Sequence, residues 1–201
     1  MTPVAQRSRG QILRSRGIGT RIGTLIGVGW LAYGLSLLGG VARIPIAIVG
    51  LVIAAVLLQR ARRLLAASRG LPAPDAAQRM ANRRVWVRFW INFVFEIVLL
   101  NLAINLLAAP SLHVYWIPAI SLVVGLHFLP MARFLDVPSY WACGGAMMLL
   151  AAATALALHR DWMAPNLLVA TEAMLNAAIL WATALHGLRA IAAGRPPATA
   201  D

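Results

Sequence analysis

The sequence predicts an all-α, polytopic transmembrane bundle of about six helices, and three observations lead to this prediction. Of the 201 residues, 61% are hydrophobic and 12% are charged, and that charged fraction is about half of what a soluble domain carries. The apolar residues come in blocks of membrane-spanning length rather than in one-sided stripes. All 18 basic residues are arginines, and they cluster beside these blocks.

The first two predicted spans cover residues 22–38 and 44–59. The first is rich in glycine, and Gly23 and Gly27 form a G-x-x-x-G pair of the kind that lets a neighbouring helix approach closely. The second opens with Pro45, which is tolerated in a first helical turn because its missing N–H has no partner there.

One long connection, residues 60–84, follows the second span. It is rich in arginine and is interrupted by Gly-Leu-Pro-Ala-Pro at residues 70–74. We interpret it as a cytoplasmic linker that lies on anionic lipid headgroups, where each arginine contributes about 1 kcal/mol. The third span covers residues 85–107 and ends before Pro110.

The last three predicted spans cover residues 115–134, 138–158 and 165–188, and no part of the chain has the composition of a soluble domain. Residues 1–201 are therefore predicted to form a single transmembrane domain. The segment 100–104 resembles the segment 175–179, and each follows a glutamate. This similarity suggests a 3+3 inverted repeat, an arrangement common in transporters.

The distribution of arginines predicts the orientation in the membrane. With six spans, both termini, the linker and the connection between spans four and five lie on one side. Only Arg43 and Arg160 then fall on the opposite side, which leaves 16 of the 18 arginines together. The positive-inside rule makes the arginine-rich side cytoplasmic. We expect a multi-pass protein of the cell inner (plasma) membrane with cytoplasmic N- and C-termini, and the +12 charge needs no nucleic-acid partner.

Polar residues within the third span follow helical spacing. Arg88, Asn92 and Glu96 are each four residues apart, so they lie along one helix face. Asn101 and Asn105 form a second pair on a different face. Arg88 lies near the cytoplasmic surface, whereas Glu96 is deep in an apolar run, where an ionisable group is costly.

Two other spans also carry polar residues. Glu172 and Asn176 share a face of the sixth span, and His127 lies in the fourth span next to Leu126. Pro130 cannot donate a hydrogen bond to the Leu126 carbonyl, so we expect a kink there. We hypothesise one polar core in the bundle interior that binds a proton or a substrate, formed by Asn92, Glu96, His127, Glu172 and Asn176.

Each of these residues also has a structural interpretation. Asparagines in membrane helices often join helices by hydrogen bonds, which would suffice for Asn101 and Asn105. His127 could be a core histidine with satisfied hydrogen bonds. The structural interpretation is weaker for the glutamates, because ionisable groups at membrane depth are usually functional.

No motif in the sequence names a reaction. No spacing such as H-E-x-x-H indicates a metal site, and we expect neither a metal nor another cofactor. Cys143 is the only cysteine, so no intrachain disulfide can form. Because no catalytic motif is present in the sequence, we predict no enzymatic activity.

The segment Gly125-Leu126-His127-Phe128-Leu129-Pro130 resembles a G-x-H-x-L-P run in small uncharacterised bacterial multi-pass membrane proteins. In those proteins the run falls in a late helix that follows an asparagine-bearing one. The resemblance implies the same helical membrane architecture and directs attention to His127 and Pro130, and it implies no activity.

Three classes of function remain open, and a membrane enzyme is the last of them, because no spacing motif supports Glu96, His127 and Glu172 as three metal ligands. The buried carboxyl groups, the proline-broken helix and the suggested repeat favour a proton-coupled transporter or channel for a small solute, in which Glu96 or Glu172 takes up and releases the proton. The alternative is an accessory or structural membrane protein. Small-residue faces are compatible with a homo-oligomer.

Overall fold

In the computed structural model, which describes residues 9–72 and 75–192, the chain consists of helices and the turns that connect them, without strands. Six α-helices follow one another, with one 3₁₀ helix between the third and the fourth. Their bounds are α1 Arg9–Leu37, α2 Arg43–Arg69, α3 Ala76–Leu106, η1 Pro110–Tyr115, α4 Trp116–Leu135, α5 Ser139–His159 and α6 Pro165–Ala192. The predicted all-helical bundle is confirmed.

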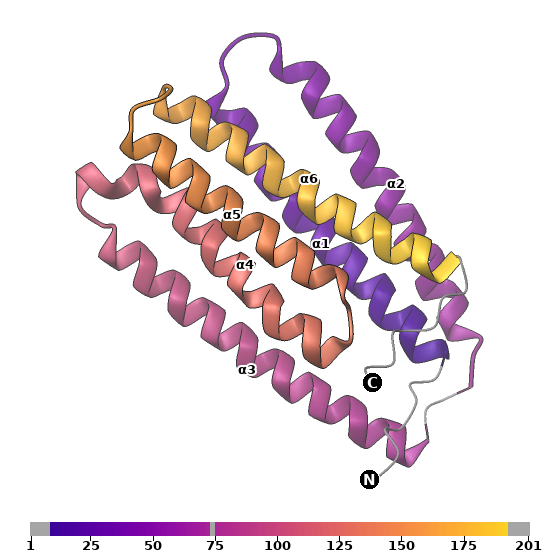
Figure 1. The fold of residues 1–201 in the computed structure, drawn as a ribbon. Coiled ribbons are helices and arrows are strands. Elements are labelled where there is room, and N and C mark those ends of the chain that lie inside the picture. The colour runs from indigo at the N-terminus through magenta and orange to yellow at the C-terminus, as the bar shows by residue number, and fades with distance from the viewer. Residues whose placement is uncertain (1–8, 73–74, 193–201) are drawn as a thin grey trace.

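Five of the helical segments are long and apolar enough to cross a membrane: α2, α3, η1 with α4, α5 and α6. The first helix, α1, is not among them, because glycines and Arg21 dilute its apolar residues. Its crossing of the membrane therefore stays a prediction. Its place in the bundle supports that prediction, because α1 runs beside α2 and α6 along most of its length (Figure 1).

The helices neighbour one another in the order α2, α1, α6, α5, α4, α3. The last helix of the chain thus packs on the first, and α3 lies at one edge of the bundle beside α4 (Figure 1). The edge helix α3 has no fully buried residue along its whole length. It is therefore the helix with the weakest attachment to the rest of the bundle.

The packing bears on the suggested inverted repeat in a specific way. In such a repeat, α1, α2 and α3 correspond to α4, α5 and α6. The contact of α3 with α4 then corresponds to the contact of α6 with α1, and both are present. The α5–α6 contact has no such counterpart, because α2 and α3 lie at opposite edges. The repeat stays a prediction.

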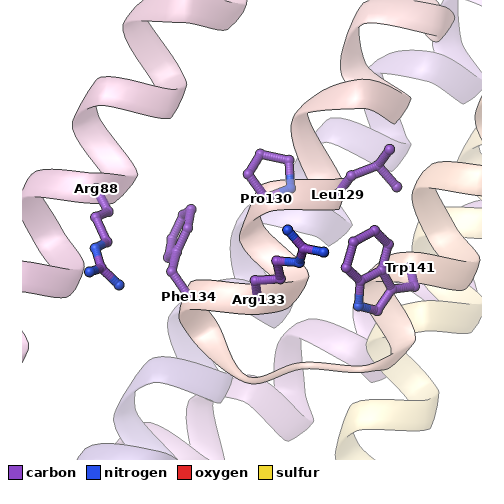
Figure 2. Close-up of a pocket in the computed structure, with 6 residues that line it drawn as sticks. All are labelled: Arg88, Leu129, Pro130, Arg133, Phe134 and Trp141. Carbon is purple, nitrogen blue, oxygen red and sulfur yellow. The ribbon is translucent and has the colours of Figure 1, made fainter.

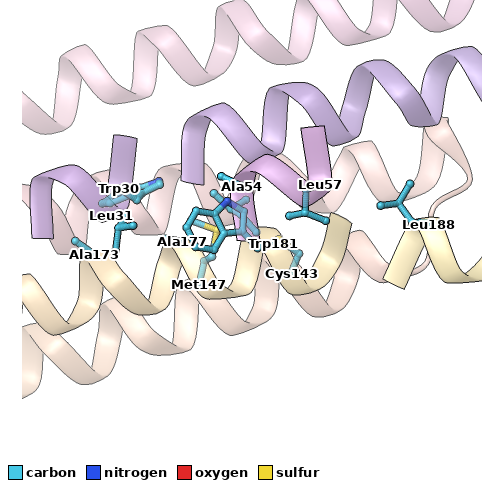
Figure 3. Packing of buried hydrophobic residues seen from close by; sticks show 11 residues of the cluster. Trp30, Leu31, Ala54, Leu57, Cys143, Met147, Ala173, Ala177, Trp181 and Leu188 are labelled. Carbon is cyan, nitrogen blue, oxygen red and sulfur yellow. The ribbon is translucent and has the colours of Figure 1, made fainter. Parts of the chain in front are cut away.

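The core lies where α1, α2, α5 and α6 meet, and its centre is Trp181 on α6 (Figure 3). The indole Nε1 of Trp181 donates a hydrogen bond to the carbonyl oxygen of Thr24 at 3.2 Å. The ring lies so close to Gly27 that a Cβ atom there would overlap Nε1, whereas a Cβ at Gly23 would meet no other atom within 4 Å. Only Gly27 of the G-x-x-x-G pair therefore serves close helix packing.

A second close contact joins α4 to α5 through two glycines. A Cβ atom on Gly144 would lie 2.5 Å from the carbonyl oxygen of Gly125, and a Cβ on Gly125 would lie 2.8 Å from that of Gly144. The two helix backbones thus touch directly, as small residues allow in membrane bundles.

The α2–α3 connection shows why α3 begins where it does. The carboxylate of Asp75 accepts a hydrogen bond from the Gln78 backbone N–H at 2.7 Å, and the Gln78 side chain accepts one from the Asp75 N–H at 3.3 Å. This reciprocal capping box satisfies two N–H groups at the helix start. Within residues 60–84, α2 continues to Arg69 and α3 starts at Ala76, so most of the predicted linker is helical.

Both described chain ends lie at the same end of the bundle as the α2–α3 connection and the α4–α5 turn (Figure 1). Every described arginine except Arg43 and Arg160 is in the half of its helix nearest this end. We refer to it below as the arginine-rich end.

Candidate functional site

Asn92, Glu96 and His127 come together between α3 and α4. One N–H of the Asn92 amide donates to the carbonyl oxygen of His127 at 3.1 Å, and the amide nitrogen also lies 2.9 Å from the ring atom Nδ1 of His127. The carboxyl oxygen Oε2 of Glu96 lies 3.2 Å from the same Nδ1. The predicted face of α3 therefore meets His127, as the shared-core hypothesis requires for these three residues.

The carbonyl oxygen of His127 fixes the orientation of the Asn92 amide. Reversing the amide would set two oxygens against each other, so the nitrogen must face His127. An N–H of Asn92 can donate to Nδ1 only when Nδ1 carries no proton, whereas an ionised Glu96 needs a proton on Nδ1. Nδ1 thus has two mutually exclusive partners, and the position of one proton selects between them.

A cavity of about 190 Å³ adjoins this group between α3 and α4. The side chains of Glu96 and His127 are 13% and 10% exposed, so neither carboxyl nor ring faces the lipid openly. The other residues that line the cavity are, apart from Asn92, apolar: Phe95, Leu99, Val123, Leu126 and Pro130.

A second polar group lies among α4, α5 and α6. The Asn176 amide and the Ser121 hydroxyl are hydrogen-bonded, with Nδ2 2.9 Å and Oδ1 3.2 Å from Oγ. Glu172, one turn before Asn176 on α6, is completely buried. The hydroxyls of Ser121 and Thr154 are near its carboxyl group.

Neither oxygen of the Glu172 carboxyl group has a hydrogen-bond partner of good geometry within the described ranges. A buried polar group without a partner costs about 1–3 kcal/mol. Burying the Glu172 carboxyl group therefore costs stability.

The two groups lie on different sides of α4. Ser121 and His127 are six residues apart on that helix, and they contact α6 and α3 respectively. No hydrogen bond or ion pair between described residues joins Glu172 or Asn176 to the Glu96–His127 group. The five predicted residues thus form two clusters, and their action as one site stays a prediction.

The secondary candidates have distinct environments. Asn101 and Asn105 are exposed on α3, and each donates to a carbonyl oxygen four residues earlier, at 2.8 Å and 2.7 Å. Arg88 is exposed one turn before Asn92. Pro130 lies inside α4, which continues to Leu135, and the expected kink stays a prediction.

Prediction from the sequence missed Ser121 and Thr154, whose hydroxyls lie near the Glu172 carboxyl group. Single hydroxyl residues are frequent in membrane helices, and their neighbours depend on the helix order. It also missed Arg133 and Trp141, which form a cation–π pair with Cζ 5.5 Å from the ring centroid. These two residues lie on different helices, α4 and α5, so no spacing within one helix predicts that they are in contact.

Within the described residues, no group of three or more His, Cys, Asp or Glu side chains could hold a metal ion. Comparison of the chain with protein-family models, curated proteins and solved structures gives no match. The resemblance carried by the G-x-H-x-L-P segment therefore stays a prediction. Three of its four fixed residues serve separate purposes, since Gly125 contacts α5, His127 contacts α3, and Pro130 lines the cavity.

Proposed function

We propose that this multi-pass membrane protein is a small proton-coupled transporter or channel, in which the Glu96–His127 pair carries the proton. The observation that supports this is the sharing of His127 Nδ1 between the Asn92 amide at 2.9 Å and the Glu96 carboxyl group at 3.2 Å. When the proton is on Glu96, Nδ1 accepts from Asn92. When the proton moves to Nδ1, the ring donates to Glu96 and loses the Asn92 bond.

This exchange gives the proton a structural consequence. The Asn92 bond to Nδ1 and the Nδ1 bond to Glu96 both join α3 to α4, one helix turn apart, so the position of the proton shifts the contact of the edge helix along α4. A proton-dependent movement of α3 relative to α4 would open or close the adjoining cavity, which is the coupling that a transporter needs. Glu172 is a second proton-binding group in this proposal, on the other side of α4.

The arginine-rich end lies in the cytoplasm in this proposal, because basic residues are retained on that side. The membrane is then the cell inner (plasma) membrane, and the arginines contact anionic headgroups. The exposed amides of Asn101 and Asn105 favour a second candidate function, an accessory protein whose α3 binds another chain in the membrane.

Aqueous access to Glu96 is the first test. In a Cys143→Ser background, Glu96→Cys is expected to react with a membrane-impermeant maleimide from the arginine-rich side, because a water-filled cavity is needed to deliver protons. The matched control is Asn101→Cys on the same helix, which faces lipid in the described fold and is expected to stay unlabelled. Equal protection of both cysteines in folded protein would favour the accessory function.

The proton role is tested with proteoliposomes that contain a pH-sensitive dye. Gradients of amino acids, sugars and organic acids are imposed in turn, and at least one is expected to move protons with the native chain. Glu96→Gln should reduce that signal to the level of empty liposomes, because glutamine cannot release a proton. Asp161→Asn makes the same chemical change in an exposed turn at φ 51°, where asparagine is also tolerated, and should preserve the flux. Full flux in Glu96→Gln would contradict the mechanism.

A further inference from the structure

A larger cavity, of about 560 Å³, opens at the arginine-rich end where α3, α4 and α5 meet. Figure 2 shows Arg88 on α3 at one side of it, the α4 residues in the middle and Trp141 on α5 at the other side. Its lining consists of Arg88, Leu129, Pro130, Arg133, Phe134 and Trp141. None of these residues belongs to the Glu96–His127 pair.

The charge of this cavity is positive. Arg133 stacks over Trp141, and this contact occupies a guanidinium face while the N–H edges stay available. Neither Arg88 nor Arg133 forms an ion pair with an acid of the described chain, including Asp136 in the adjacent turn. Guanidinium groups from two neighbouring helices thus line one cavity, with Phe134 between them in Figure 2.

The apolar residues that line the cavity indicate which kind of anion it binds. Leu129, Pro130 and Phe134 make the floor apolar. An anion that also carries a hydrocarbon part therefore binds this cavity more tightly than an anion without one. Trp86 and Trp90 are exposed on α3, on either side of Arg88 in the sequence. Tryptophans at this level are typical of the membrane interface, which places the cavity at the depth of lipid headgroups.

We propose that this cavity binds an anionic phospholipid, whose headgroup is contacted by Arg88 and Arg133 and whose acyl chains lie along the apolar surfaces of α3 and α4. Guanidinium groups bind phosphate through paired, charge-assisted hydrogen bonds. Since α3 buries no residue completely and packs mainly on α4, a headgroup contacted by one arginine from each helix joins them. The lipid thereby completes the attachment of α3.

The test measures phosphatidylglycerol binding to the delipidated full chain in a non-ionic detergent, by native mass spectrometry and by thermal unfolding. Phosphatidylglycerol is expected to bind and raise the unfolding temperature, and phosphatidylcholine to do so much less. Arg88→Gln with Arg133→Gln should weaken phosphatidylglycerol binding about tenfold, which corresponds to 1.4 kcal/mol. Arg62→Gln with Arg63→Gln is the matched control, because it removes the same charge from exposed positions on α2.

Three outcomes would overturn the proposal. One is an equal loss of binding in the Arg62/Arg63 control, which would indicate diffuse attraction. Another is competition by inorganic phosphate or glycerol phosphate as strong as that of the lipid, which would indicate a site for soluble anions. The third is undiminished binding in both single variants, Arg88→Gln and Arg133→Gln, which serve if the double variant fails to fold.

Discussion

Gly144→Leu is expected to prevent stable packing of α4 on α5, whereas Gly145→Leu leaves the fold intact. The side chain at residue 144 would start 2.5 Å from the carbonyl oxygen of Gly125, and a backbone atom inside a helix cannot rotate away. Overpacking typically costs about 1–3 kcal/mol and occasionally more, and we expect the upper end because the contact is between two backbones. At Gly145 a Cβ atom meets no other atom within 4 Å.

The measurement is the free energy of unfolding in mixed detergent micelles, followed by tryptophan fluorescence. Gly144→Ala should already be destabilised by about 1–3 kcal/mol. Gly145→Ala should be unchanged or slightly more stable, because alanine favours helix over glycine. If the two alanine variants unfold alike, the α4–α5 contact described above is wrong.

Glu172→Met is expected to raise the free energy of unfolding by about 1–3 kcal/mol, since it replaces an unpartnered buried carboxyl group by an apolar side chain of similar size. If Glu172 binds a coupled proton, the same variant loses proton flux. Stability and activity would then change in opposite directions, as is common for residues retained for function.

Asn176→Leu is the matched comparison on the same face of α6. The Asn176 amide is hydrogen-bonded to Ser121, so its loss should destabilise the fold by roughly 1 kcal/mol. Both variants are measured in the same micelles. A loss of stability in Glu172→Met as large as in Asn176→Leu would mean that the carboxyl group has a partner in the membrane, such as water or a cation.

The sequence could predict what depends on spacing along one helix. Arg88, Asn92 and Glu96 lie on one face of α3, and Glu172 and Asn176 on one face of α6, because residues four apart must do so. The all-helical class followed in the same way from the apolar blocks. The Asp-x-x-Gln pattern at Asp75 is also a local signal, and it marks the start of α3 within the segment predicted as a linker.

What the sequence could not predict depends on which helices are neighbours. The spans are apolar on all sides, so no stripe indicates that α6 packs on α1 or that α3 lies at the edge. For the same reason nothing distinguishes Gly27, which lies under Trp181, from Gly23, which meets no other atom. The division of the polar residues into two clusters on opposite sides of α4 follows from that helix order alone.

The pairing of α6 with α1 has a consequence for biosynthesis. Residues such as Gly27 and Gly34 of α1 are covered by α6, which is translated after the five other described helices. The helix α1 can therefore pack on α2 early, but this surface of α1 stays uncovered until α6 has been translated. A chain truncated before Pro165 would expose this surface of α1 to lipid and to quality-control proteases, so the insertion of α6 completes the packing of the six described helices.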